Sequence, residues 1–120
     1  EHDGFIIANP EYNSAFSAAL KNAIDWASRM DEGETPLAPF KGKTATLMAA
    51  SPGALGGLRG LASLRTLLSN LGMLVHPTQQ AIANVHTLVD EQGVVTDEKT
   101  ITKLHKLGAM ASEFTAQLAK

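Results

Sequence analysis

Short runs of apolar residues, each closed by glycine or proline, alternate along this chain with longer segments in which apolar residues recur at helical spacing. The first run covers residues 5–8 and lies between Asp3-Gly4 and Asn9-Pro10. A run that is apolar at every position is typical of a strand buried on both faces, and such strands belong to parallel sheets. Residues 5–8 are therefore predicted to form a buried strand of a parallel sheet.

An amphipathic helix is predicted after this strand. Lys21, Asp25 and Arg29 lie four residues apart and share one face. The opposite face carries the apolar residues Phe16, Leu20, Ala23, Ile24 and Ala27. Residues 30–42 contain two prolines and two glycines among polar residues, which predicts a connection without regular structure.

A second strand and helix follow this connection. A second buried strand is predicted at roughly residues 44–50, and it ends at Ser51-Pro52-Gly53. Gly72 is well placed to end the helix that comes next. The stripe that predicts this helix consists of Leu58, Leu61, Leu64, Leu68 and Leu71.

Residues 73–75 predict a third short strand, which is broken at His76-Pro77 because proline cannot donate to a central ladder. A turn is indicated at residues 90–93, and Asp97 is suited to cap a last helix. The apolar stripe of that helix consists of Ile101, Leu104, Leu107, Ala111, Phe114 and Leu118.

Three strand–helix units in succession predict an α/β fold, in which right-handed crossovers build an open parallel sheet with helices on both faces. Ligands of such sheets bind beyond the carboxyl ends of the strands. The loops at those ends are residues 9–13 and residues 51–57. Function is therefore expected in these two loops.

Each loop also has an interpretation without a ligand. Residues 10–13 are compatible with a simple turn in which Asn13 or Ser14 caps the following helix. In the second loop, Gly53 and Gly56-Gly57 leave backbone that a flat ligand can approach closely. From these residues alone, a glycine-rich turn without a ligand is equally well supported.

Composition narrows the classes of function. With 120 residues, 44% apolar and 18% charged, the chain fits one compact domain. A net charge of -2 without a basic cluster argues against a nucleic-acid partner. No apolar run approaches the roughly 20 residues that cross a bilayer, so no membrane partner is expected and cytoplasm is the expected compartment. Because cysteine is absent, any redox chemistry must come from a bound cofactor.

The order of several motifs resembles the NADPH-dependent FMN reductases, a family that includes chromate- and quinone-reducing flavoproteins and related azoreductases. The resemblance extends over about residues 3–97, and the ordered combination is more specific than either loop. It rests on Asn9-Pro-Glu-Tyr-Asn13, Leu20-Lys-Asn-Ala-Ile-Asp-Trp-Ala-Ser-Arg29, Gly42-Lys43, Ser51-Pro-Gly53 and Gly56-Gly57.

This resemblance implies a flavodoxin-like fold and a flavoenzyme that uses FMN. Hydride would pass from NADPH or NADH through FMN to quinones, azo compounds or metal oxyanions, and the usual assembly is a homodimer or homotetramer. Carried over by position, Pro10, Glu11, Tyr12 and Asn13 would contact the isoalloxazine ring, and Ser51 and Gly53 would meet its other edge. Since the cofactors carry the hydride, no catalytic side chain is expected.

The chain departs from the family pattern at its beginning. These reductases open with a strand and a Ser- and Arg-containing loop that holds the FMN phosphate at a helix N-terminus, and nothing here precedes Glu1-His2-Asp3-Gly4. Residues 1–120 are therefore interpreted as the last three strand–helix units of the domain. In the flavodoxin strand order 2-1-3-4-5, the strand at residues 5–8 is then an open edge, which natural proteins avoid. The alternative to an enzyme is a non-catalytic flavodoxin-like fragment or interaction module that docks through this edge.

Four further residue types have weaker signals. The histidines are scattered without i, i+4 pairs, so no metal site is expected. Tyr12 suits either the ring face or a subunit interface, and Trp26 suits either ordinary packing or a subunit contact. Arg59 and Arg65 have no acidic residue between positions 53 and 76. A solvated helix face is favoured for them over an anion site for the NADPH 2′-phosphate.

Overall fold

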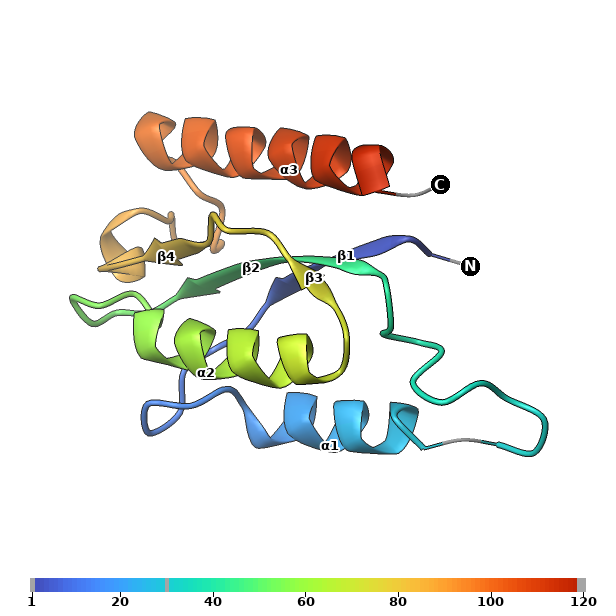
Figure 1. The fold of residues 1–120 in the computed structure, drawn as a ribbon. Coiled ribbons are helices and arrows are strands. Elements are labelled where there is room, and N and C mark those ends of the chain that lie inside the picture. Colours follow the sequence, from blue (N-terminus) through green and yellow to red (C-terminus); the bar gives the residue numbers. More distant parts are fainter. Residues whose placement is uncertain (1, 30, 119–120) are drawn as a thin grey trace.

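Strands and helices alternate along the chain in the computed structural model, which describes residues 2–29 and 31–118. Figure 1 shows one helix, α3, over one face of the sheet and α1 and α2 over the other. This arrangement confirms the predicted α/β fold with helices on both faces. The elements are β1 (Gly4–Ala8), α1 (Ala18–Ala27), β2 (Thr44–Ala50), α2 (Leu58–Asn70), β3 (Leu74–Val75), β4 (Gln80–Ile82), the 3-10 helix η1 (Val85–Thr87) and α3 (Glu98–Leu118).

The sheet is built around β2, which pairs in parallel with all three other strands. On one side Gly4 lies opposite Thr44 and Ala8 lies opposite Met48. On the other side, β3 pairs with the beginning of β2 and β4 pairs with its end. The sheet is thus fully parallel, as predicted.

The third strand differs from the prediction because it is split into β3 and β4. Pro77 lies in the break, where it has no N–H for a ladder. Arg65 supports the interruption, since its guanidinium donates to the carbonyl oxygen of His76 at 2.8 Å and to Oε1 of Gln79 at 3.1 Å. The strand at residues 80–82 has too few apolar residues to be recognised from its pattern.

The first strand is exposed, although its pattern predicts burial on both faces. Phe5 is 36% and Ile6 is 55% exposed, because only β2 pairs with β1 among the described residues. This open edge agrees with the expectation drawn from the flavodoxin strand order. An apolar strand at an unprotected edge is uncommon in natural sheets.

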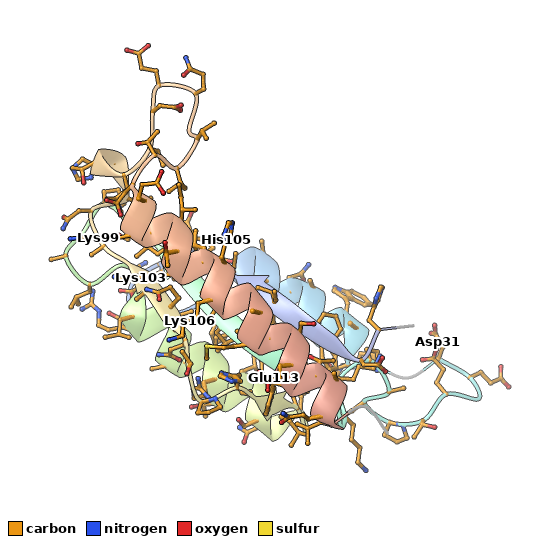
Figure 2. All side chains as sticks on the ribbon, turned by 90° about the horizontal axis from the view of Figure 1, so that it is seen from above. Asp31, Lys99, Lys103, His105, Lys106 and Glu113 are labelled. Atoms are coloured by element: carbon orange, nitrogen blue, oxygen red, sulfur yellow. The ribbon has the colours of Figure 1, made fainter. Side chains whose placement is uncertain are left out.

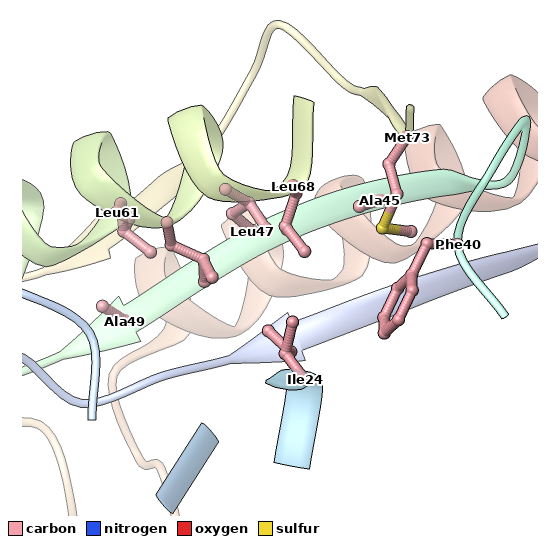
Figure 3. Close-up of a cluster of buried hydrophobic side chains, with 9 residues drawn as sticks. Ile24, Phe40, Ala45, Leu47, Ala49, Leu61, Leu68 and Met73 are labelled. Carbon is pink, nitrogen blue, oxygen red and sulfur yellow. The ribbon is translucent and has the colours of Figure 1, made fainter. Parts of the chain in front are cut away.

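The hydrophobic core lies between β2 and the pair α1 and α2. Leu47 of β2 is completely buried, as are Leu61 and Leu64 of α2. Figure 3 shows the side chains of Ile24 and Phe40 closing this cluster opposite α2. Burying a leucine side chain stabilises a fold by roughly 1.5–3 kcal/mol, so these residues hold the strands and their loops in place.

The opposite face of β2 is covered by α3 through a smaller contact. The hydroxyl oxygens of Thr44 and Thr115 lie 2.6 Å apart and share a hydrogen bond. A β-carbon at Gly4 would overlap both hydroxyl groups, so glycine is needed for α3 to lie this close to the sheet.

The start of α3 is capped as predicted. Asp97 accepts from the backbone N–H of Thr100 at 2.8 Å.

The start of α1 differs from the alternative in which Asn13 or Ser14 caps the helix. Its cap is Ser17, whose hydroxyl accepts from the backbone N–H of Leu20 at 3.2 Å. Asn13 and Ser14 do not cap the helix, because both have a positive φ, 50° and 68°, within a turn that precedes it. The sequence offers several small polar residues in succession here, and only the shape of the turn decides among them.

Candidate functional site

The two loops expected to carry function lie at the same edge of the sheet. Asn9 directly follows β1 and Ser51 directly follows β2, and these strands are parallel neighbours with Ala8 opposite Met48. Figure 1 shows both connections beyond the arrowheads of their strands. The fold therefore places Pro10, Glu11, Tyr12 and Asn13 on one loop of this edge and Ser51 and Gly53 on the next.

Asn9 fixes the shape of the first loop. It is buried, with 2% of its surface exposed, and its backbone N–H donates to the carbonyl oxygen of Met48 at 2.9 Å. Its side-chain amide donates to the carbonyl oxygen of Pro10, and its Oδ1 accepts from the backbone N–H of Ser17. One side chain thus joins the two ends of the loop. Asn9 belongs to the predicted motif, but the sequence alone does not indicate that its side chain holds the loop.

A tight turn projects Tyr12 into solvent. The backbone groups of Tyr12 and Ala15 exchange two hydrogen bonds of 2.9 and 3.0 Å, and the two residues between them have positive φ. This is the form of a two-residue type I′ turn, which asparagine tolerates better than most residues. Tyr12 is 62% exposed, so its ring is available to a ligand or another subunit.

Glu11 connects the first loop to the start of α2. Its Oε2 accepts from the backbone N–H of Gly60 at 2.9 Å, and its Oε1 accepts from Nε of Arg59 at 3.0 Å. The hydrogen bond from Gly60, followed by the interaction with Arg59, holds the pKa of the Glu11 carboxyl below its ordinary value. The side chain of Glu11 is only 10% exposed. Any contact between Glu11 and a ligand at this edge is therefore left to its backbone.

The two arginines of α2 have partners that local sequence does not show. Arg59 forms an ion pair with Glu11, 48 residues earlier, at 3.0 Å between Nη2 and Oε1. Arg65 donates to carbonyl groups of the break between β3 and β4. Both arginines therefore have partners within the chain, although no acidic residue lies near them in sequence, and the Arg59 side chain is 60% exposed.

The second loop is held by hydrogen bonds around Ser51. The Ser51 hydroxyl accepts from the backbone N–H of Gly53 at 3.1 Å, and the Ser51 N–H donates to the carbonyl oxygen of Ile82 at 3.0 Å. Asn84 donates from its backbone to the carbonyl oxygen of Gly53 at 3.3 Å. Residues 82–84 are therefore part of this edge, which sequence reasoning missed because β4 itself was not recognised.

The glycines of the second loop have two different roles. A β-carbon at Gly53 would meet only the Ser51 hydroxyl, at 3.5 Å, so this position faces open space. At Gly56 a β-carbon would lie 2.6 Å from the backbone of Ile82 and Ala83, and φ is 60°. At Gly57 it would lie 2.7 Å from the Ala49 side chain. Only Gly53 has the open approach that a flat ligand requires, whereas the other two glycines allow packing within the chain.

The chemical groups at this edge fit the ring of a flavin. The backbone N–H groups of Asn13, Ser14, Ala54 and Leu55 have no hydrogen-bond acceptor among the described residues, and the polar edge of an isoalloxazine carries several acceptors.

No group of three or more potential metal ligands occurs in the described part of the chain. None of the helices seen in residues 2–29 and 31–118 has the length and apolar character to cross a membrane.

Comparison with known proteins gives a consistent set of relatives. A family model described as NADPH-dependent FMN reductase matches residues 1–87. The chain is 40% identical over 100 residues to an NAD(P)H-dependent FMN reductase of Pseudomonas aeruginosa, covering 81% of this chain and 50% of that protein. It is 38% identical over 104 residues to the quinone reductase of Escherichia coli, covering 85% and 53%, respectively.

A solved structure shows the same arrangement. FerB, a flavoenzyme NAD(P)H:(acceptor) oxidoreductase from Paracoccus denitrificans, matches with a TM-score of 0.73 and 31% sequence identity over 98% of this chain and 61% of its own. This likeness supports the flavodoxin-like fold. The chain spans about half the length of the curated relatives that it matches. The match of the family model, together with these relatives, shows that the chain belongs to the NADPH-dependent FMN reductase family.

Proposed function

We propose that this chain forms the flavin-ring side of an FMN-dependent oxidoreductase that uses NADPH or NADH and reduces quinones, azo compounds or metal oxyanions. The observation that carries the proposal is the position of both family motifs, at the carboxyl ends of the adjacent parallel strands β1 and β2. The names of the relatives support the class of reaction, since they include FMN reductases, quinone reductases and an NADPH azoreductase.

The work of this chain in such a reaction is to hold and orient the ring. Bound FMN supplies two-electron hydride chemistry, so no side chain needs to act as nucleophile or general base. Backbone N–H groups of Asn13 and Ser14, and of the segment after Gly53, are free to donate to the ring. Pro10 and Tyr12 offer apolar and aromatic surface beside it.

Three side chains fix the shape of the loops that carry these donors. Asn9 fixes both ends of the first loop, and the Glu11 carboxylate joins that loop to α2. Ser51 does the same for the second loop through its hydrogen bond with Gly53. The proposed cofactor-binding residues are therefore Pro10, Glu11, Tyr12, Asn13, Ser51 and Gly53, with Glu11 acting through its backbone.

The proposal includes an assembly and a compartment. Trp26 is 74% exposed on α1, and Leu55 and Leu58 are 50% and 45% exposed. Tryptophan is enriched among the residues that anchor protein interfaces, so the exposed Trp26 supports a homodimer or homotetramer. The reaction is placed in the cytoplasm, where reduced nicotinamide cofactors are available as hydride donors.

An NMR titration with flavins tests the proposed ring site. Millimolar FMN and riboflavin, which lacks the phosphate, are added separately to the isotope-labelled chain. If the ring is the bound group, both ligands shift the same amides, at residues 10–14 and 51–57. Shifts confined to other segments, or shifts with FMN but not with riboflavin, would show that the assignment is wrong.

A further inference from the structure

The edge strand on the far side of β2 carries surplus residues between β3 and β4. β3 ends at Val75, opposite Ala45 of β2, and β4 begins opposite Met48. The intervening residues 76–79 therefore span only two residues of β2. An insertion of this kind is a bulge, which bends a strand and re-aims the residues that follow it.

Pro77 does not force this bulge. His76 donates its backbone N–H to the carbonyl oxygen of Ala45 at 2.8 Å, so residues 76 and 78 of a straight edge strand would face β2. Pro77 would then face outward, where its missing N–H removes no ladder bond. A straight strand, with Thr78 opposite Met48, is thus compatible with the proline.

The side chains of β4 give little preference between the two registers. A shift of two residues returns every side chain to its own face of the sheet. Among the three residues of β4, only Ile82 is buried, and Gln80 would take its place in the straight strand. A contact outside the strand must therefore select the register.

Arg65 of α2 makes such a contact. Its Nη2 donates to the carbonyl oxygen of His76 at 2.8 Å and to Oε1 of Gln79 at 3.1 Å. In a straight ladder the His76 carbonyl would accept from the N–H of Leu47, so the guanidinium takes the place of that ladder bond. Arginine suits this position because its planar group presents several donors in a fixed geometry.

The α3 face gives the bulge less support. A hollow of about 290 Å³ lies between Gln80 and the side chains of Lys103 and Lys106, which Figure 2 shows on one side of α3. The His76 ring contacts the Phe114 ring, with 4.9 Å between their centroids. His76 keeps its place opposite β2 in either register, so this ring contact does not distinguish the two.

The register of β4 decides which residues meet the loop after β2. The carbonyl oxygen of Ile82 accepts from the N–H of Ser51 at 3.0 Å, and the N–H of Asn84 donates to the carbonyl oxygen of Gly53 at 3.3 Å. At Gly56, a β-carbon would lie 2.6 Å from the backbone of residue 82, so the loop packs directly on this strand. A two-residue shift would replace the β4 side of all three contacts.

We propose that Arg65 is a positioning residue of the flavin-ring site. It holds residues 76–79 as a bulge, selects the register of β4 and thereby fixes the shape of the loop at residues 51–57. Arg65 acts at the beginning of β4, whereas the loop lies at its end. The selection of the register stands on the hydrogen bonds alone, and only the consequence for flavin rests on the proposed function.

Disulfide cross-linking measures the register directly, because the chain has no cysteine of its own. Neighbouring strands lie about 4.8 Å apart, within the range of Cα separations that a disulfide joins. With Met48→Cys as one partner, Gln80→Cys reports the observed register and Thr78→Cys reports the shifted one. When Arg65 is present, the 48–80 cross-link should dominate under mild oxidation.

Replacing Arg65 should change which cross-link forms. Arg65→Met keeps an apolar stem and removes every donor. The ratio of cross-links should move about tenfold or more toward the 48–78 pair, because a hydrogen bond from a charged donor contributes at least that much. Arg65→Lys keeps the charge, but its compact ammonium lacks the fork that reaches both acceptors, so its ratio should lie between the two. An unchanged ratio in Arg65→Met would overturn the proposal.

Leu68→Ala separates positioning from a general loss of stability. Leu68 is buried in the core on the same helix, so its truncation destabilises the fold and leaves the guanidinium in place. The cross-link ratio should stay at the value of the parent chain. A ratio that moves as far in Leu68→Ala as in Arg65→Met would show that Arg65 only stabilises the fold, and the proposal would then be wrong.

NMR shows whether the register reaches the second loop. Without flavin, the amide resonances of Ser51 and Gly53 should shift in Arg65→Met and not in Leu68→Ala. A changed register with unchanged loop resonances would overturn the positioning role. Riboflavin affinity should fall in proportion to the fraction of chain in the shifted register. If the register and the loop change but riboflavin affinity does not, the ring site is contradicted and the role of Arg65 in the register is retained.

Discussion

The carboxylate of Glu11 accepts a hydrogen bond from the backbone N–H of Gly60, 49 residues away in sequence, at 2.9 Å between oxygen and nitrogen. Gly60 lies in the first turn of α2, where backbone N–H groups lack partners within the helix. A negative charge is favourable there because the helix dipole is positive at that end. The first loop of the proposed flavin site is thereby joined to the helix that follows the second loop.

Removing this carboxylate should weaken flavin binding without touching the ring. We expect Glu11→Ala to lower flavin affinity and to speed hydrogen exchange at residues 12–15, because the loop loses its contact with α2. Glu11→Gln retains an acceptor for one donor and should have a smaller effect. Flavin titrations and exchange measurements on both variants check this, and equal behaviour of Ala and Gln variants would contradict it.

Lowering the pH should break the hydrogen bond between the Glu11 carboxylate and the backbone N–H of Gly60. The pKa of Glu11 is lower in the folded chain than its ordinary value of 4.5, so its contribution is complete above pH 4.5 and is lost as pH falls through the folded pKa. The N–H resonance of Gly60 should shift over this range in the parent chain and remain unchanged in Glu11→Gln. The pKa of Asp97 is lowered as well, chiefly by the Thr100 hydroxyl, so overall stability is a less specific measure than this local signal.

Two glycines three residues apart should respond differently to a valine substitution. Gly53→Val adds a side chain in open space, so it should leave the fold intact and reduce flavin affinity. Gly56→Val meets the backbone of Ile82 and Ala83 at a positive φ, so it should lower the free energy of unfolding by about 1–3 kcal/mol or more. Thermal unfolding and flavin titration of both variants separate the two roles. Unchanged flavin affinity in a folded Gly53→Val variant would argue against the second loop.

The 120-residue chain by itself should bind FMN weakly. The phosphate is the strongly anionic group of FMN, and the family resemblance places its site in a strand–helix unit that lies outside residues 1–120. Each missing charge-assisted hydrogen bond contributes roughly 1.5–3 kcal/mol, and about 1.4 kcal/mol corresponds to a tenfold change in affinity. Affinity should therefore fall by several powers of ten relative to a complete reductase. Submicromolar binding in a fluorescence titration of the folded monomer would refute this expectation.

Trp26 should contribute to self-association of the chain. Its side chain is 74% exposed on α1, where it supports nothing in the core. Trp26→Ala is expected to shift the sedimentation profile toward monomer while leaving the unfolding temperature nearly unchanged. Arg29→Ala, another exposed residue of the same region, is the matched control. A parent chain that is monomeric at micromolar concentration would remove the basis of the proposed assembly.

The sequence pattern predicted the strand and the helix in which buried residues follow one another at regular spacing, β2 and α2. Residues 44–50 are apolar or small throughout, and the strand occupies the predicted range because β2 is covered on both faces. Three leucines of the predicted α2 stripe, Leu61, Leu64 and Leu68, are buried in the core, as their spacing requires, whereas Leu58 at its beginning is 45% exposed. In contrast, β4 has a single buried residue, Ile82, so its three residues gave no pattern to detect. Short edge strands are defined by their partners more than by their own composition.

The site was predicted as a pair of loops but without its internal contacts. The position of residues 10–13 and 51–53 follows from the order of strands and needs no side-chain detail. The pairing of Glu11 with Arg59 joins residues far apart in sequence, and no local rule identifies it. Likewise, Gly53 and Gly56 look alike in sequence, and only the neighbouring backbone of residue 82 shows that a side chain has room at Gly53 and none at Gly56.

The central place of β2 has a consequence for the order in which the chain acquires structure during synthesis. Every strand of the described sheet pairs with β2, and β2 begins at Thr44. A nascent chain that ends before that residue contains β1 and α1 without β2, the strand that β1 joins in the described sheet. The pairing of residues 4–8 with β2 can therefore be completed only after β2 has left the ribosome, and until then the apolar residues of β1 lack this protection against aggregation.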